Sequence, residues 1–175
     1  MVSILKPIPC DEFNVLYDML RHIAVPIKTK ISGGRGDFGR HRAMTFGITR
    51  GRFNGVIGLS HYSKKHPHIY EEIKRIGKVI GAEGANSIHL NHNVVCPRHL
   101  DANNVGDSVL VSFGDYTGCN IVVQNPSGEE VKYDAFCQPI KFNGAELVHY
   151  NTSDLVGNKY SLVFFISKYK EVNAD

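Results

Sequence analysis

The sequence predicts an α+β fold that is mainly β, with a sandwich or barrel of short strands backed by N-terminal helices. Two segments with helical periodicity, 10–24 and 66–80, come early in the chain. From residue 87 onward, short runs rich in Val, Ile, Tyr and Phe alternate with turn residues such as Asn, Asp and Gly. The 175 residues, 42% of them hydrophobic, are enough for one domain with a buried core.

Each predicted helix carries one apolar face. In the first, apolar residues recur at spacings of three and four from Phe13 to Ala24, and Pro26 would end the helix. In the second, isoleucines repeat at the same spacings from Ile69 to Ile80, and Pro67 suits the first helical turn. Both apolar faces are expected to pack against the β-rich part of the chain.

Six runs are predicted to be strands, and turn residues separate them. Gly114 and Gly118 bracket a short segment that we expect to be a hairpin turn, although Asp115 or Tyr116 could instead reach into a pocket. The predicted strands are residues 87–95, 107–113, 120–125, 130–136, 145–150 and 159–167.

Residues 28–55 differ from the rest. They hold seven Lys and Arg residues against one acid, Asp37, and seven glycines interrupt them. We expect an irregular or short-stranded basic segment, either a solvated surface loop or a surface that contacts phosphate. The whole chain has a net charge of only +3, which permits nucleic-acid contact without requiring it.

Four cysteines are scattered without a CxxC pair, so neither a zinc ribbon nor a disulfide framework is expected. No run of about 18 apolar residues predicts a membrane span. The first residues lack the apolar core of a secretory signal. We therefore expect an intracellular protein of the cytoplasm or nucleus.

The motif HLD places His99 two residues before Asp101. On an extended segment these side chains point to one side, so an imidazole and a carboxylate can meet at one metal ion. His149, at the end of a predicted strand, could supply a third ligand. Two histidines and one carboxylate form the facial triad of non-haem Fe(II) oxygenases, although an HxD pair alone also fits a polar turn.

Ten residues after His149 comes Lys159, with Ser161 two positions further along a predicted strand. The two share a face, so their ammonium and hydroxyl groups could bind a carboxylate together. The alternative for Lys159 is a solvated charge at the start of the strand.

HxD, a distant His, and a basic residue about ten positions later with Ser two beyond it resemble the signature of Fe(II)/2-oxoglutarate-dependent dioxygenases. The resemblance covers 87–168 and extends more loosely through 62–77. Within this superfamily, residues 91–123 look most like the small TET/JBP-like oxygenases of viruses and mobile elements. The superfamily resemblance implies one oxygenase domain over 1–175. This domain would have a helical and basic part (1–85) and a double-stranded β-helix, or jelly-roll, core (86–170).

The resemblance also implies site residues and cofactors. His99, Asp101 and His149 would hold Fe(II) and carry the catalysis, with 2-oxoglutarate and O2 as cosubstrates. Lys159 and Ser161 would hold the far carboxylate of 2-oxoglutarate, although TET-like members usually have Arg where this chain has Lys159. Two residues of the preceding strand could also meet 2-oxoglutarate or substrate, or else lie on the outer face of the sheet; they are Asn91 and Asn93.

The implied reaction is hydroxylation of a C–H bond, and three functions remain open. The first is oxidation of the methyl group of a 5-methylpyrimidine, such as 5-methylcytosine, in DNA or RNA, with phosphate contacts from the basic segment. The second is hydroxylation of a protein, for example at prolyl residues, or of a small molecule; Lys159 favours it slightly. The third is a jelly-roll binding module without activity. The weak candidates for substrate contact are Arg40, Arg42, Arg50 and Arg52.

Overall fold

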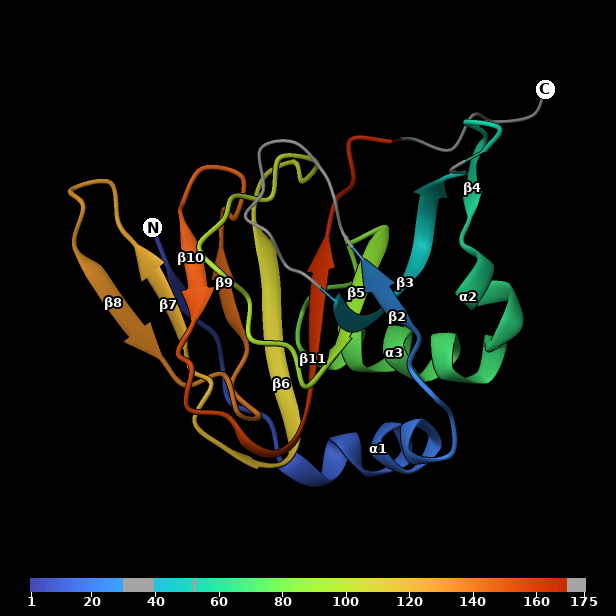
Figure 1. Ribbon diagram of the computed structural model, residues 1–175, viewed down its shortest axis with the longest axis horizontal. Coiled ribbons are helices and arrows are strands. Elements are labelled where there is room, and N and C mark those ends of the chain that lie inside the picture. Colours follow the sequence, from blue (N-terminus) through green and yellow to red (C-terminus); the bar gives the residue numbers. More distant parts are fainter. Residues whose placement is uncertain (30–39, 52, 170–175) are drawn as a thin grey trace.

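The computed structural model describes residues 1–29, 40–51 and 53–169. Within these residues the chain forms two antiparallel sheets and three α-helices (Figure 1). The helices lie beside one part of the larger sheet, and the smaller sheet lies at the opposite side of the molecule (Figure 1). The predicted α+β, mainly β class is confirmed, and the large antiparallel sheets are consistent with a jelly roll.

The larger sheet has eight strands within the described residues, and the order of seven is β1-β9-β6-β11-β5-β3-β2, with β4 paired to β3. The strands are β1 (Ser3–Ile4), β2 (Ile27–Thr29), β3 (Arg40–Arg50), β4 (Ile57–Leu59), β5 (Ser87–His92), β6 (Ser108–Thr117), β9 (Ile140–Phe142) and β11 (Val156–Phe165). The smaller sheet has the order β10-β7-β8, with β7 (Ile121–Gln124), β8 (Glu130–Tyr133) and β10 (His149–Asn151).

Both predicted helices are present. The first is a 3-10 turn (Cys10–Phe13) that continues into α1 (Asn14–Arg21), and the second is α3 (Pro67–Val79), which begins at the predicted proline. A short helix not expected from the sequence, α2 (His61–Lys65), precedes α3, and the Ser60 hydroxyl caps it by accepting a hydrogen bond from the Ser63 N–H at 3.1 Å.

The central strands of the larger sheet have one apolar face. Their register aligns four side chains that are buried between the sheet and α1 and α3. We call these the apolar row: Met44, Leu90, Leu162 and Val111. All four side chains are fully buried, so this face forms the main core. Phe13 contributes from the helical side by stacking on Phe113, with ring centroids 4.7 Å apart.

The other face of the same strands is polar at three of the four neighbouring positions, and successive side chains on a strand point to opposite sides. One residue along from the apolar row, the register aligns a second set across β3, β5, β11 and β6. We call these the polar row: Ala43, Asn91, Ser161 and Ser112. The polar row faces a cavity between the two sheets, and a second, smaller core containing Ile121, Val123 and Leu147 lies beside it.

The expectation for the basic segment was wrong in one respect. Residues 40–50 form one strand of 11 residues, β3, which pairs with β5 along its buried part. Its apolar residues Met44 and Phe46 are fully buried against the helices, while Arg40 and Arg50 lie exposed at its two ends. Tertiary burial therefore outweighs the glycines and arginines that predicted an irregular or short-stranded segment.

The hairpin expected at 115–117 is also absent. Strand β6 continues through Thr117, pairing with Val156 at the start of β11. Gly114 lies within this strand at a φ of 125°, and a Cβ there would stand 2.2 Å from the Asn158 carbonyl oxygen. The glycine thus allows close approach of β11 instead of forming a turn.

Cys10 and Cys137 form a disulfide with their Cα atoms 5.4 Å apart, contrary to the expectation of no disulfide framework. The bond ties the start of the helical segment to the loop before β9. Their spacing of 127 residues has no sequence signature, because the partners meet only in the folded chain.

We expect Cys10→Ser to lower the free energy of unfolding by roughly 3–5 kcal/mol, because the bond closes a long loop in the unfolded chain. Urea unfolding followed by circular dichroism would measure this, with Cys96→Ser, at a cysteine outside this disulfide, as the matched control. Equal midpoints for Cys10→Ser and Cys96→Ser would contradict a stabilising disulfide.

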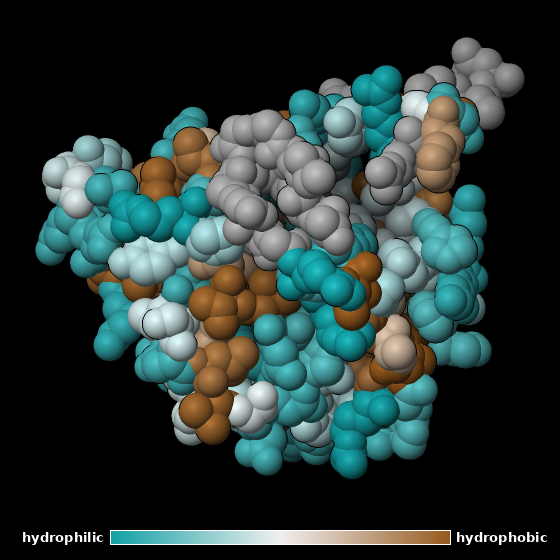
Figure 2. Space-filling view, in the orientation of Figure 1, coloured by the Kyte–Doolittle hydropathy of each residue, from teal (hydrophilic) through white to brown (hydrophobic). Residues whose placement is uncertain are grey.

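The outer surface is mixed. Apolar groups stand among hydrophilic residues on the face shown in Figure 2, a pattern normal for a folded domain. Among the described residues, none of the helices is both long and apolar enough to span a bilayer.

Candidate active site

The HLD segment and β10 lie side by side because His99 and His149 exchange backbone hydrogen bonds. The His99 N–H donates to the His149 carbonyl at 3.1 Å, and the His149 N–H donates to the His99 carbonyl at 3.2 Å. The Asp101 N–H donates to the Gly144 carbonyl at 2.8 Å, which fixes the loop next to the turn before β10. Residues 50 positions apart in sequence are thus brought into one cluster.

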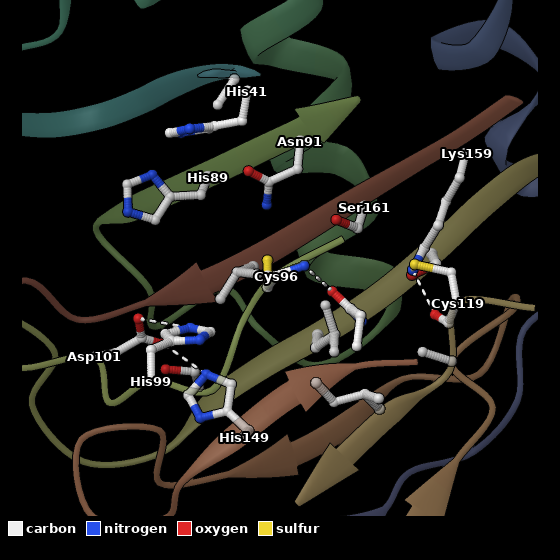
Figure 3. Close-up of a pocket in the computed structure, with 18 of the residues that line it drawn as sticks. His41, His89, Asn91, Cys96, His99, Asp101, Cys119, His149, Lys159 and Ser161 are labelled. Carbon is white, nitrogen blue, oxygen red and sulfur yellow. Dashed lines mark hydrogen bonds and ion pairs between the residues drawn. The ribbon is translucent and has the colours of Figure 1, made fainter. Parts of the chain in front are cut away.

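The three side chains converge. Each offers one ligand atom, and these atoms lie within 4.8 Å of one another. The Asp101 carboxylate lies beside both rings, with Oδ2 3.3 Å from Nε2 of His149 and Oδ1 3.6 Å from Nε2 of His99 (Figure 3). Both imidazoles are buried, and Phe142 packs edge-on against His149 with ring centroids 5.0 Å apart.

Backbone carbonyls orient both rings. Nδ1 of His99 lies 2.6 Å from the Pro97 carbonyl oxygen, and Nδ1 of His149 lies 2.8 Å from the Leu147 carbonyl oxygen. A carbonyl can only accept, so each Nδ1 carries the hydrogen and each Nε2 presents its lone pair toward the carboxylate. This is the arrangement in which histidines ligate metals, with the second nitrogen held by a backbone oxygen.

A cavity of about 790 Å³ extends from the triad along the polar row. In Figure 3 the triad lies at one end and Lys159 at the other, with Asn91 and Ser161 between them. Its volume lies within the range of small-molecule sites. Asp101 is the acid among the described residues that line it, and the lining cations are Lys28 and Lys159, so the cavity favours anionic ligands. Burial lowers the pKa of the Lys28 ammonium.

Lys159 is only 5% exposed, contrary to the alternative of a solvated charge. Its Nζ donates to the Cys119 carbonyl at 2.8 Å, lies 3.2 Å from the Cys119 sulfur, and stands 5.4 Å from the centre of the Tyr116 ring. Among the described residues, no carboxylate forms a salt bridge with it. A buried ammonium held only by neutral groups is costly unless an anion joins it, so this end of the cavity fits a carboxylate ligand.

Ser112 supplies a second sign of an absent ligand. Its Oγ is buried, and within the described residues it has no hydrogen-bond partner of good geometry. Burial raises the pKa of the nearby Tyr116 phenol and Ser112 opposes part of that shift, but the contact between the two hydroxyls does not meet hydrogen-bond geometry. Ser112 pairs with Ser161 across β6 and β11, so two hydroxyls stand together on the cavity face. A ligand oxygen would satisfy such a hydroxyl.

Not every predicted residue lines this cavity. Asn91 does, but Asn93 does not; its φ is 52° and its Oδ1 accepts a hydrogen bond from the Lys159 N–H at 2.7 Å. Asn93 therefore helps to fix the backbone of Lys159, and its side chain amide oxygen is already engaged. His89 also lines the cavity, with Nδ1 3.0 Å from the Thr45 hydroxyl.

The predicted arginines lie elsewhere. Arg40 and Arg42 line a neighbouring hollow of about 280 Å³, and His41 lines both this hollow and the main cavity. Arg42 also donates from Nη1 to the Val25 carbonyl at 2.8 Å. Arg50 stands 6.0 Å from the Tyr169 ring, and Arg52 is outside the described residues.

Three residues of the site could not be identified from the sequence. Cys119 and Ser112 stand in runs that read as a turn and a strand, and Gly144 reads as part of an Asn-Gly turn. The one available signal was the spacing of Ser108 and Ser112, with Leu110 between them. Residues at spacings of two share a face of a strand, so this spacing places both hydroxyls on one face.

Comparison with known proteins gives no matching family model and no matching curated protein. Solved structures do match. A Burkholderia pseudomallei oxidoreductase of the 2OG-Fe(II) oxygenase family aligns with a TM-score of 0.64 and 16% identity, over 97% of this chain and 86% of that one. NgTET1 in complex with 5mC DNA aligns with a TM-score of 0.62 and 13% identity, over 95% of this chain and 72% of that one.

This chain has the fold of the Fe(II)/2-oxoglutarate-dependent oxygenases. A Pseudomonas putida prolyl-4-hydroxylase shares this oxygenase fold, with a TM-score of 0.56 and 14% identity over 97% of this chain and 93% of that one. The superfamily resemblance drawn from the sequence is thus confirmed at the level of the fold. Within the oxygenase fold, the triad and Lys159 lie in one cavity.

Proposed function

We propose that the chain is an Fe(II)- and 2-oxoglutarate-dependent dioxygenase that hydroxylates the methyl group of a 5-methylpyrimidine base in nucleic acid. One observation carries the chemistry: a His-Asp-His cluster lines the same cavity as a buried ammonium for which the described part of the chain supplies no salt-bridge partner. Three ligands that leave coordination positions open are typical of non-haem Fe(II) oxygenases.

The residues have separate tasks. His99, Asp101 and His149 would hold Fe(II) through two Nε2 atoms and a carboxylate oxygen, and the Pro97 and Leu147 carbonyls keep both rings in the ligating orientation. When bound, Fe(II) with 2-oxoglutarate and O2 supplies oxidation of a C–H bond, with 2-oxoglutarate converted to succinate and carbon dioxide.

Lys159 and the polar row would orient the cosubstrate. The Lys159 ammonium matches the far carboxylate in charge, and the hydroxyls of Ser161 and Ser112 can donate to its oxygens. The Cys119 carbonyl holds Nζ in place, so the ammonium is positioned before the ligand arrives. Asn91, next to Ser161 in the register, can donate from its amide group to the same ligand.

The nucleic-acid substrate is supported by the strand that borders the cavity. His41 lines both the main cavity and the hollow of Arg40 and Arg42. These arginines alternate with the cavity-facing residues of β3, so they would meet phosphates that lie beyond the edge of the cavity. A base must leave its stack to reach a buried reaction centre, which a cavity of this size accommodates. The fold is shared with NgTET1, solved in complex with 5mC DNA.

A second candidate is hydroxylation of a protein, such as at prolyl residues. Lysine in place of arginine at position 159 and the likeness to a prolyl-4-hydroxylase support it.

The deciding experiment measures succinate release by the purified chain with Fe(II), 2-oxoglutarate and O2, using panels of methylated and unmethylated DNA, RNA and proline-containing peptides. We expect 5-methylcytosine DNA to raise succinate release above unmethylated DNA and to yield the hydroxymethylated base. Stimulation by peptides alone would support the second candidate. If the chain neither binds metal nor releases succinate with any substrate, the remaining function is that of a jelly-roll binding module without activity.

Binding to oligonucleotides gives a separate prediction. We expect Arg40→Ala to weaken DNA binding and to reduce the slope of log K against log salt by about one, because one phosphate contact is lost. Fluorescence anisotropy at several salt concentrations measures the slope. Arg21→Ala, at the last residue of α1 and not among the residues that line the hollow or the cavity, is the matched control. Equal slopes for both variants would remove Arg40 from the interface.

A further inference from the structure

We propose that Gly144 is a positioning residue of the metal centre, because the absence of a side chain there leaves the space that the Asp101 carboxylate and the His149 ring occupy. This inference rests on the proposed function, since it concerns the placement of the two ligands. It assigns a role to a residue that contributes no ligand atom and belongs to the turn before β10.

The crowding around Gly144 involves ligand atoms. A Cβ on Gly144 would stand 2.9 Å from Oδ2 of Asp101, 3.2 Å from Cε1 of His149 and 3.6 Å from Cβ of Asp101. The first distance is too short for a carbon and an oxygen that are not bonded, and the second is tighter than ordinary contact. One methyl group would therefore press on two of the three candidate ligands.

The backbone cannot easily retreat from this contact. The Gly144 carbonyl accepts the Asp101 N–H at 2.8 Å, so moving the turn away would break the hydrogen bond to the residue that is crowded. The turn is also held from within. The Asn143 side chain accepts the Ala145 N–H at 3.1 Å, and the Asn143 carbonyl accepts the Leu147 N–H at 2.9 Å.

The same turn reaches the second ligand. Leu147 ends the hydrogen-bonded segment that begins at Asn143, and its carbonyl orients the His149 ring at 2.8 Å. The Gly144 carbonyl thus accepts a hydrogen bond from Asp101, and its Cα lies next to the side chains of both Asp101 and His149. A single short turn sets the distance between the HLD loop and β10.

An added methyl group is expected to disturb the ligands more than the fold. Gly144 is not among the residues with a left-handed φ, so alanine suits its backbone. The crowded atom is the end of the Asp101 side chain, which can rotate away at little cost to the metal-free protein. That rotation would take Oδ2 away from His149, where the metal would bind.

The test compares Gly144→Ala with Gly84→Ala, a glycine whose added Cβ would meet no atom within 4 Å. Co(II) is titrated into the metal-free proteins by isothermal calorimetry, and thermal unfolding of the same proteins is followed without metal. We expect Gly144→Ala to raise the Kd for Co(II) by roughly 10–100-fold, as for changes that misplace metal ligands. Gly84→Ala should leave the Kd unchanged.

Each outcome has a distinct meaning. Equal Co(II) affinity for Gly144→Ala and the wild type overturns the inference while leaving the proposed function intact. No Co(II) binding by the wild type counts against the proposed function. If the wild type binds no Co(II), or if Gly144→Ala is unstable without metal, a second measurement is made. The loss of stability caused by Gly144→Ala is then compared between the wild-type and the Asp101→Ala backgrounds. A loss that disappears in the Asp101→Ala background supports crowding of Asp101, and a loss that persists overturns it.

Discussion

Asp101→Ala is expected to abolish succinate formation, with a loss of more than about 100-fold, while the chain keeps its fold. The carboxylate is the only anionic group of the His-Asp-His cluster. Its loss removes a ligand outright, whereas changes one shell further out already cost 10–100-fold. Asp101 lies in a loop outside the main core, and its backbone hydrogen bond to Gly144 does not depend on its side chain. His99→Ala should have the same effect.

Succinate is quantified after incubation with Fe(II) and 2-oxoglutarate, and circular dichroism reports the fold. His22→Ala is the matched control, because His22 is exposed at the end of α1. Normal turnover by Asp101→Ala and His99→Ala would refute the metal centre. If these variants lose the circular dichroism signal of the folded chain, His99→Gln is tested instead, because glutamine keeps more of the side-chain volume.

Lys159→Met is expected to raise the KM for 2-oxoglutarate by roughly 10–100-fold, because a charged hydrogen bond to the cosubstrate contributes about 1.5–3 kcal/mol. Methionine approximates the length and apolar stem of the buried lysine, so packing against Tyr116 is largely retained. Steady-state kinetics with 2-oxoglutarate as the varied substrate measures the effect.

Lys141→Met is the control, since Lys141 also stands on a strand, β9, but with an exposed side chain. Lys159→Arg separates charge from fit, because it keeps the cation and changes its shape. An unchanged KM in Lys159→Met would place the carboxylate of 2-oxoglutarate elsewhere. Metal binding should be unaffected in all three variants, which distinguishes this site from the triad.

The parts predicted from the sequence are those with a local signal. Helix α3 has isoleucines at helical spacing after a proline, and β11 ends in the apolar run from Leu162 to Phe165, so both elements were found, with bounds that differ from the structure by one to three residues. His99 and Asp101 were chosen as candidates because two positions on an extended segment share a side. His149 and Lys159 were recognised only by their spacing within a family signature.

The missed parts depend on contacts between distant segments. Strand β3 looks like a basic loop until Met44 and Phe46 are seen buried against helices. The Cys10–Cys137 bond and the contact of Lys159 with Cys119 join residues that the sequence does not relate. Gly144 gives no signal at all, because its importance comes from atoms that approach it from another loop.

The alternation of the two rows on the central strands has a practical consequence for engineering. Positions of one parity, such as Leu90 and Leu162, stabilise the folded chain, whereas their immediate neighbours Asn91 and Ser161 face the cavity. A mutagenesis library confined to the cavity-facing parity could therefore alter ligand preference while sparing thermal resistance. The core-facing residues would be left unchanged in such libraries, so that they keep the folded chain stable.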